Sequence, residues 1–364
     1  MMQVSQLTTE IISLLKELIS IPSFSKEEDK TADIIYNYLQ SKNISTNRMV
    51  NNVFAYNHYF SPNKPTILLN SHHDTVKPNP GYTKDPFSPI IEEGKLYGLG
   101  SNDAGGCLAS LLATFLYFYH RNDLKYNLCF AATAEEEISG SNGIELFIKE
   151  SASKHILGKN KDDFAIIGEP TGMHMAVAEK GLMVLDCKNT GKSGHAARDE
   201  GINALYLAMK DLEWFKSYTF ERISPFLGPV KMSVTSIHTE NKAHNVVPDT
   251  CHFIVDIRVN ELYTFDEILH TIRQNVKTDV TPRSTRIKSS MIAESHPIVL
   301  SGIELGKTLY GSPTTSDKAL VGIPALKIGP GDSARSHSAD EYIYLHEIEH
   351  GIKDYIHLLE KVIL

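Results

Sequence analysis

Three short apolar runs that each end in histidine or acidic residues constrain the fold of this chain more than any other feature. Residues 66–69 lead into Ser71-His72-His73-Asp74, residues 127–132 into Glu135-Glu136-Glu137, and residues 164–167 into Gly168-Glu169-Pro170. Apolar runs of this length are typical of strands buried on both faces, and residues 107–119 between them have the pattern of a buried helix. Strands alternating with helices predict an α/β fold with a mostly parallel sheet flanked by helices, whose functional groups lie beyond the carboxyl ends of the strands.

Helical patterns are also present near both ends of the chain. Apolar residues recur at helical spacing over residues 9–19 and 32–39, and an amphipathic helix is expected from about Leu345. A further strand is expected at residues 325–328, before the turn Gly329-Pro330-Gly331. The α/β pattern therefore continues in the C-terminal part.

The middle of the chain has a different pattern. Between about residues 182 and 260, alternating strands at 183–185, 230–237 and 251–259 surround a helix that begins near Asn203. Because the α/β pattern resumes after Ser290, we expect one discontinuous domain of residues 1–178 plus 290–364, interrupted by an inserted α+β domain at residues 179–289.

Composition excludes several classes of protein. The formal net charge of -8 argues against nucleic acid as a partner, because such binding depends on clustered Lys and Arg. The sequence has no apolar run of membrane length, and Lys16 and Glu17 interrupt the N-terminal segment, which lacks the layout of a signal peptide. We therefore expect a cytoplasmic protein with no membrane partner.

The cysteines bear on the kind of metal site that is possible. Four cysteines fall singly inside apolar segments, at Cys107, Cys129, Cys187 and Cys251, which favours buried, reduced thiols over disulfides or a thiolate zinc site. The residues that follow the predicted strands are histidines and carboxylates, which suit zinc, or cobalt or manganese. Two such ions about 3.5–4 Å apart can share one carboxylate and one water. Taken singly, each acidic residue is more often a helix cap or a solvated loop charge.

The order of the motifs resembles a known family. The motifs are Ser71-His72-His73-Asp74, a glycine-rich segment from Gly98 to Asp103, Glu136-Glu137, Gly168-Glu169-Pro170 and Ser336-His337-Ser338. Together they resemble the di-zinc aminoacylase and carboxypeptidase family of metallohydrolases, which includes acetylornithine deacetylase and succinyl-diaminopimelate desuccinylase. The resemblance covers nearly the whole chain. It implies a zinc-peptidase-like catalytic domain whose insertion serves as a lid or dimerisation domain.

The resemblance also implies roles for particular residues. The implied metal ligands are His72 and Glu169 on one ion, His337 and Glu137 on the other, and Asp103 bridging both. Asp74 is expected to orient the His72 ring through its second nitrogen. Glu136 is expected to be the general base, with Glu135 as its rival if the register slips by one residue.

Three residues of the insertion complete the expected site. His195 in Gly194-His195-Ala196 resembles a histidine that reaches the active site of a neighbouring subunit in a homodimer and stabilises an oxyanion, although it could also cap the following turn. Asn245 and Arg258 resemble positions that grip the substrate, and an Arg fork matches a carboxylate. The loop of residues 314–317 resembles another substrate-facing segment. Other histidines, including His58, His120, His155 and His357, are expected to have no role.

The implied activity is hydrolysis of the amide bond of a small N-acyl amino acid by two divalent ions. Chain length and the Asp103-Ala104-Gly105-Gly106 variant resemble deacetylases of arginine biosynthesis, so N-acetylornithine is the first expected substrate. The alternatives within the same chemistry are N-acetylcitrulline, N-succinylornithine, succinyl-diaminopimelate and a dipeptide. From a different class, the chain could be a non-catalytic, metal-binding dimeric scaffold, which would have no need of a base such as Glu136.

Overall fold

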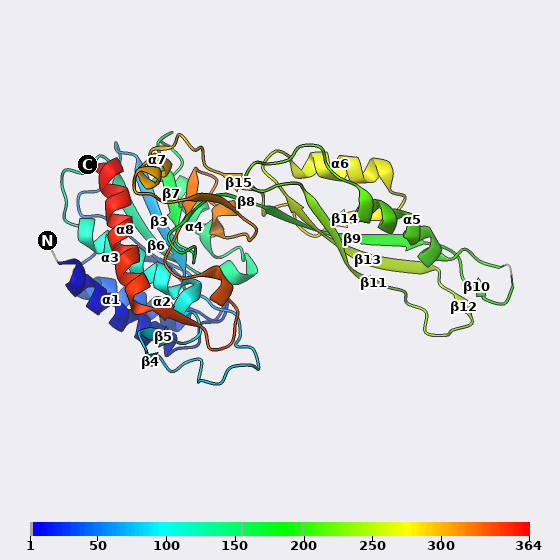
Figure 1. The fold of residues 1–364 in the computed structure, drawn as a ribbon, viewed down its shortest axis with the longest axis horizontal. Helices are drawn as coiled ribbons and strands as arrows, with labels where there is room; N and C mark the ends of the chain where they lie inside the picture. Colours follow the sequence, from blue (N-terminus) through cyan, green and yellow to red (C-terminus); the bar gives the residue numbers. More distant parts are fainter. Residues whose placement is uncertain (1–2, 154–155, 199) are drawn as a thin grey trace. The chain divides into compact units, whose positions relative to one another are not determined.

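The computed structural model describes residues 3–153, 156–198 and 200–364, so that His155 lies outside the described residues. The chain divides into two compact units, which are described separately (Figure 1). The first unit comprises Met1–Val177, Met291–Tyr310 and Ser316–Leu364, and the second comprises Ala178–Ser290 and Gly311–Thr315. None of the described helices combines the length and apolar character that a bilayer span requires.

A large mixed sheet lies mainly in the first unit. Its strands are β1 (Thr46–Met49), β2 (Asn52–Tyr56), β3 (Thr66–His72), β6 (Asn127–Thr133), β7 (Phe164–Ile167), β8 (Met175–Glu179), β15 (Ser290–Met291), β16 (Leu309–Ser312) and β17 (Ala325–Lys327), of which β8, β15 and β16 include residues of the second unit. Their order is β1-β2-β6-β3-β7-β17-β8-β15, with β16 also on β8. The four central strands β6, β3, β7 and β17 are parallel, whereas β1, β2 and β8 run antiparallel to their neighbours. The predicted, mostly parallel α/β sheet is confirmed.

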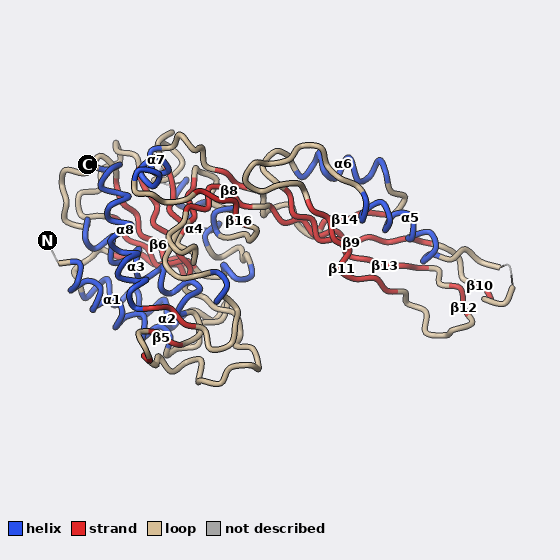
Figure 2. Tube along the Cα trace, viewed as in Figure 1, coloured by secondary structure: helices blue, strands red, loops and turns tan. Residues whose placement is uncertain are grey.

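Helices cover both faces of this sheet, which explains why its central strands are apolar throughout. Helix α1 (Val4–Ile19), α3 (Gly106–Phe118) and α8 (Leu345–Ile363) pack against one another, and α7 (Pro297–Glu304) packs on α8 (Figure 2). The Phe115 ring of α3 lies against Phe130 of β6. Alternate residues of the same strands, such as Cys129, pack with Phe147 of α4 (Ile144–Ser153). A strand that is buried on both faces is apolar throughout, whereas a strand with one exposed face alternates apolar and polar residues.

Two smaller elements complete the first unit. Helix α2 (Asp29–Ser41) packs against β1 and β2. A three-stranded sheet of β18 (Tyr342–Tyr344), β5 (Lys95–Tyr97) and β4 (Ile91–Glu92) joins the C-terminal part of the chain to the segment before α3. All four cysteines of the chain are buried and free of disulfides.

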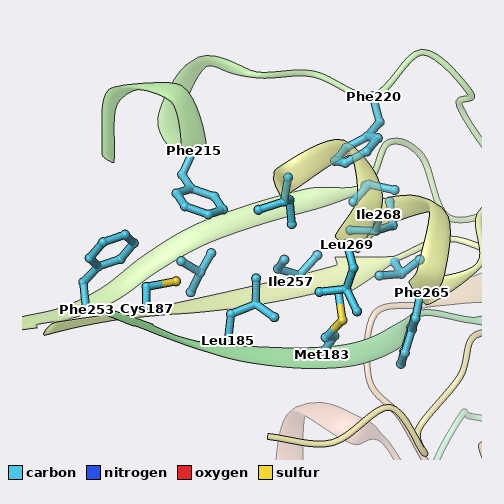
Figure 3. Close-up of a cluster of buried hydrophobic side chains, with 14 of the residues drawn as sticks. Met183, Leu185, Cys187, Phe215, Phe220, Phe253, Ile257, Phe265, Ile268 and Leu269 are labelled. Carbon is cyan, nitrogen blue, oxygen red and sulfur yellow. The ribbon is translucent and has the colours of Figure 1, made fainter. Parts of the chain in front are cut away.

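The second unit is a two-layer α+β structure. Its sheet has the order β11 (Lys231–His238), β13 (Thr250–Val259), β9 (Gly181–Thr190) and β14 (Asp279–Pro282), all antiparallel. Helices α5 (Ala204–Ser217) and α6 (Phe265–Asn275) lie on one face, where alternate strand residues such as Leu185, Phe253 and Ile257 form the core (Figure 3). The side chains of the other face are accessible and mostly polar, because successive residues of a strand point to opposite faces.

Local sequence explains the starts of both helices. Asn203 accepts from the backbone N–H of Leu205 and Tyr206 and caps α5, while Thr264 and Glu267 form a capping box at the start of α6. A separate ribbon of β10 (Gly194–His195) and β12 (Val246–Val247) extends from the unit.

Candidate metal centre

Parallel strands bring the predicted polar clusters to one edge of the sheet. His72 is the last residue of β3 and is paired in register with Thr133, the last residue of β6. The turn after β6 contains Glu136 and Glu137, and Glu169 follows β7 by two residues. Because the carboxyl ends of parallel strands meet at one edge, these side chains converge.

Two further residues reach this edge from distant parts of the chain. Asp103 lies in the segment between β5 and α3, and His337 lies between β17 and β18. The His72 Nε2 atom is 3.4 Å from Asp103 Oδ1 and 3.9 Å from Glu169 Oε1. The His337 Nε2 atom is 3.7 Å from Asp103 Oδ2 and 3.0 Å from Glu137 Oε2. The structure therefore brings together all five predicted ligands, with one Asp103 oxygen facing each histidine.

The donor set fits divalent cations. The Nε2 atom of His72 is buried and has no hydrogen-bond partner within the described residues, although carboxylates surround it. Ligands of a tetrahedral zinc ion at about 2.1 Å lie roughly 3.4 Å apart, close to the nitrogen–oxygen separations seen here. Ligand atoms of His72, Asp103 and Glu137, and those of His72, Glu136 and Glu169, lie within 4.8 Å of one another.

Proximity alone does not separate the role of Glu136 from that of Glu169. Both carboxylates lie 3.9 Å from His72 Nε2. Burial, and then the charge of Glu169, raise the pKa of Glu136 well above its usual range, with a further contribution from Asp317. A carboxylate with a raised pKa is suited to proton transfer, which is the property that distinguishes a general base from a ligand.

The surrounding carboxylates strongly favour positive charge at the two histidines. Burial opposes protonation of His72, but the nearby carboxylates of Asp103 and Asp74 outweigh burial and raise the pKa of His72 well above its usual range. The hydrogen bond with Glu137 raises the pKa of His337 to about 9. The same carboxylates attract any cation, and a metal ion would compete with protons for the two histidine nitrogens.

Asp74 organises the site in a way that the sequence did not indicate. The expected contact with the His72 ring is made at 2.9 Å by the backbone oxygen of Asp74, while the carboxylate Oδ1 is 3.5 Å from Nδ1. The carboxylate instead accepts from the backbone N–H of Glu136 and Glu137 at 3.1 and 3.2 Å, and from Ser25 Oγ at 2.7 Å. Asp74 therefore positions the acidic pair as well as the histidine.

Glu341 is a positioning residue that sequence reasoning missed. Its buried carboxylate accepts from the backbone N–H groups of Gly100, Asn102 and Asp103 at 3.0, 2.8 and 2.9 Å. These bonds hold the segment that presents Asp103. Since they join residues more than two hundred positions apart, no local pattern could have revealed them.

Glu135, the rival for the base, has a structural role. Its backbone is left-handed, with φ of 56°, and its Oε1 accepts from Asn142 Nδ2 at 2.9 Å. A Cβ at Gly140 would lie 2.5 Å from the Cβ of Glu135, closer than two such atoms can approach, so this turn requires glycine. The Glu135 side chain therefore stabilises the turn that carries Glu136.

The three predicted residues of the insertion lie in the second unit. His195 Nδ1 accepts from the N–H of Ala197 at 3.1 Å, which is the turn-capping contact, and the Asn245 carbonyl accepts from Ala196 N–H at 2.9 Å. Arg258 lies on β13 and forms a bidentate pair with Asp256 at 2.8 and 3.1 Å. The structure therefore places His195 and Asn245 side by side and Arg258 elsewhere on the unit.

Comparisons with known proteins agree with this architecture. Residues 68–361 match the model of peptidase family M20/M25/M40. The chain is 30% identical to acetylornithine deacetylase of Buchnera aphidicola subsp. Schizaphis graminum, covering 91% of this chain and 92% of that protein. It is 29% identical to succinyl-diaminopimelate desuccinylase of Orientia tsutsugamushi (strain Ikeda), covering 81% and 79% of the two chains. It is 30% identical to the LysW-lysine/LysW-ornithine hydrolase of Sulfurisphaera tokodaii, covering 98% and 96%.

A solved structure shares the fold. The aminopeptidase PepT of Bacillus cereus superposes with a TM-score of 0.77 at 17% identity, covering 98% of each chain. The chain belongs to peptidase family M20/M25/M40 and is an enzyme that acts on amide bonds. Its relatives carry several different substrate names, so family membership alone does not identify the substrate.

Proposed function

We propose that the chain is a two-metal amidohydrolase that removes the acyl group from a small N-acyl amino acid. In this proposal His72 and Glu169 hold one ion, His337 and Glu137 hold the other, and Asp103 bridges them. The observation that carries it is the position of Asp103, whose Oδ1 is 3.4 Å from His72 and whose Oδ2 is 3.7 Å from His337. Zinc is the favoured metal, with cobalt or manganese as alternatives, because the donors are nitrogen and oxygen.

The residues around this centre divide the chemistry between them. Bound ions would acidify a water and polarise the acyl carbonyl. Glu136 takes the proton of the attacking water and delivers it to the leaving amine, and its raised pKa suits a group that must both accept and release a proton. Asp74 accepts hydrogen bonds from the backbone N–H groups of Glu136 and Glu137, and these bonds fix the position of the carboxylate that takes the proton.

We further propose that the second unit completes the site in a homodimer. His195 of one subunit would stabilise the oxyanion in the active site of the other. Asn245 and Arg258 would bind the substrate, and Arg258 would release Asp256 to pair with the substrate carboxylate. The edge strand β11 and the helix α5 supply apolar surface for association, because Val234, Ile237, Tyr206 and Met209 are all exposed. A cytoplasmic location belongs to the same proposal and is supported by four buried, free thiols.

N-acetylornithine is the proposed substrate, with ornithine and acetate as products of a step in arginine biosynthesis. The support is the similarity to acetylornithine deacetylase over 91% of this chain. The similarity to a succinyl-diaminopimelate desuccinylase is of the same strength, and this makes the succinylated substrate the second candidate. Amine release should be assayed on N-acetylornithine, N-acetylcitrulline, N-succinylornithine, succinyl-diaminopimelate and dipeptides. A metal-loaded chain that turns over none of them would favour the dimeric scaffold instead.

The central prediction concerns Glu136. Replacement by Gln should lower kcat by about 10²–10⁴-fold, because a general base contributes that much, while bound metal and folding stay unchanged. Activity should be measured together with metal content by mass spectrometry, with Glu349→Gln as an exposed control on α8. An active, metal-loaded variant would refute the assignment, and loss of one ion would show that Glu136 is a ligand.

A further inference from the structure

The loop between β3 and β4 joins the two halves of the candidate metal centre. It leaves β3 directly after His72 and runs from residue 73 to residue 90 without a regular helix or strand. Loops of this length without secondary structure are uncommon in compact domains and usually have a function. Residues 79–84 of the loop contact the turn of residues 337–340. The loop therefore connects His72 to the turn that carries His337.

The turn that carries His337 depends on such contacts. The His337 side chain is 56% exposed, whereas that of His72 is 1% exposed at the end of a buried strand. The backbone of His337 and that of Asp340 are left-handed, with φ of 58° and 53°. This conformation is unfavourable for residues other than glycine, and it persists where surrounding contacts hold it. The position of His337 is therefore set by the residues that fix the turn.

The Asp340 carboxylate makes the largest number of these contacts. Its Oδ1 atom accepts from the backbone N–H groups of Thr83 and Lys84 at 2.8 and 2.9 Å, and its Oδ2 atom accepts from Thr83 Oγ1 at 2.5 Å. At the other end of the turn, Asn79 Nδ2 donates to the His337 carbonyl at 3.2 Å. The turn is therefore bound to the loop on both sides of its left-handed residues.

We propose that Asp340 is a positioning residue for His337 and controls how tightly the second ion is held. This inference rests on the proposed metal centre, in which His337 and Glu137 hold the second ion. Glu341, the next residue, instead holds the backbone of Asp103, which bridges both ions. Loss of the Asp340 contacts should therefore weaken one ion, whereas loss of the Glu341 contacts should weaken both.

The rival explanation is that Asp340 acts only through its negative charge. Asparagine separates the two explanations, because its carbonyl oxygen can accept from both backbone N–H groups and its amide can donate to the Thr83 hydroxyl. It keeps the hydrogen bonds and removes the charge. Asp340→Asn should therefore hold the second ion as wild type does. Asp340→Ala should hold it about 10–100-fold more weakly, the usual cost of losing an outer partner of a ligand.

The test is the metal content of the full chain, measured by mass spectrometry at a buffered free zinc concentration that just saturates wild type. Wild type and Asp340→Asn should contain two ions per chain. Asp340→Ala should contain one, as should His337→Ala, which serves as the reference for loss of the second ion. Asp162→Ala, at an exposed position before β7, should contain two. Excess zinc should restore the second ion to Asp340→Ala, because only the affinity is reduced.

Hydrogen exchange of the metal-free protein tests the contact itself. The backbone N–H groups of Thr83 and Lys84 should exchange faster in Asp340→Ala than in Asp340→Asn, while the amides of β3 keep wild-type protection and show that the variant is folded. If Asp340→Ala does not fold, Thr83→Val removes one of the three hydrogen bonds at an exposed position and should still weaken the second ion alone.

The outcomes separate this proposal from the proposed function. Two ions in Asp340→Ala, or wild-type affinity in Thr83→Val where the alanine variant does not fold, would overturn the role of Asp340. One ion in Asp340→Asn would also overturn it, because charge rather than position would then be responsible. All of these results leave the two-metal centre in place. Fewer than two ions in wild type would instead contradict the centre itself, and this inference with it.

Discussion

At the residue scale, two adjacent histidines show how environment separates side chains of one type. His72 is surrounded by Asp103, Asp74 and other carboxylates, and its pKa is raised well above the usual range. Burial lowers the pKa of His73 to about 4, and its ring contacts Thr31 Oγ1 at 2.9 Å and the Asn51 carbonyl at 2.8 Å. His73 is therefore a buried, neutral residue with a structural role.

The lowered pKa of His73 predicts a specific loss of stability in acid. A depressed pKa means that the contribution is fully present above about pH 6.5 and is lost as pH falls through about 4, because the unfolded chain takes up the proton first. The shift corresponds to roughly 3 kcal/mol. Between pH 7 and pH 4, metal-free wild type should therefore lose about that much more stability than His73→Gln.

Urea unfolding followed by far-ultraviolet circular dichroism at both pH values would measure this difference. The single tryptophan, Trp214, lies in the second unit and is a poor probe of the first. His270→Gln, at an exposed position, should keep the acid sensitivity of wild type. Equal sensitivity in wild type and His73→Gln would contradict the assignment of a buried neutral ring.

At the scale of elements, the segment from Gly100 to Asp103 depends on the Glu341 carboxylate that it surrounds. Replacing Glu341 by Gln keeps the shape but presents an amide N–H₂ to backbone donors, so at least one of the three hydrogen bonds is lost. Since Asp103 is the proposed bridging ligand, metal affinity and activity should fall by about 10–100-fold, the usual cost of losing an outer partner of a ligand.

Chelator competition and activity assays would measure this effect, and Glu349→Gln serves again as a conservative exposed control. Supplying excess metal should restore part of the activity, because the weakened step is retention of the ions. Wild-type metal affinity in Glu341→Gln would show that the segment holds its shape without the carboxylate.

Elements that carry a motif at their end were predicted well, and so were the strongly patterned elements α1, α3, α8 and β13, whereas α6 and β8 were missed. Residues 164–167 form β7 as predicted, and the strand predicted at 66–69 extends to His72, because the polar end of β3 still pairs with β6 and β7. Helix α6 was missed although Thr264-Phe265-Asp266-Glu267 is a capping box that could have been recognised. Strand β8 was also missed, although residues 175–178 are a short apolar run of the kind that predicts a buried strand.

The candidate site shows the same division. Sequence order and family resemblance selected the five residues that the structure brings together. His72 ends a strand, Glu137 and Glu169 follow strands, and Asp103 precedes a helix, whereas His337 lies in a loop and was selected by the resemblance alone. The contacts that hold them, from Asp74 to the backbone of Glu136 and from Glu341 to the backbone of Asp103, depend on tertiary structure alone. The residue types were enough to predict the candidate metal ligands, but not the hydrogen bonds that position them.

At the scale of the whole molecule, the proposal that His195 acts in a neighbouring subunit predicts complementation. Glu136→Gln and His195→Ala should each be nearly inactive. In a mixed dimer of the two, one site keeps an intact Glu136 and receives an intact His195 from its partner, so that about half the activity of a wild-type dimer should return.

Co-expression with two different affinity tags would isolate the mixed dimer for assay. If His195 acts within its own chain, or only caps its turn, the mixed dimer should recover nothing beyond the activity of its separate components. Replacing Val234 and Ile237 on β11 with lysine should abolish recovery by preventing association, and this can be checked by light scattering.

The order of strands in the main sheet has a consequence for how the protein is made. Strand β17 lies between β7 and β8, yet it is synthesised long after both, and His337 follows it. When the first two hundred residues have left the ribosome, the edge of β7 that later pairs with β17 is therefore still unpaired. The acidic side chains of the candidate metal centre are present at that stage, but His337 is not. Until the last segments emerge, the nascent polypeptide is exposed to aggregation, and any prematurely terminated product would remain so.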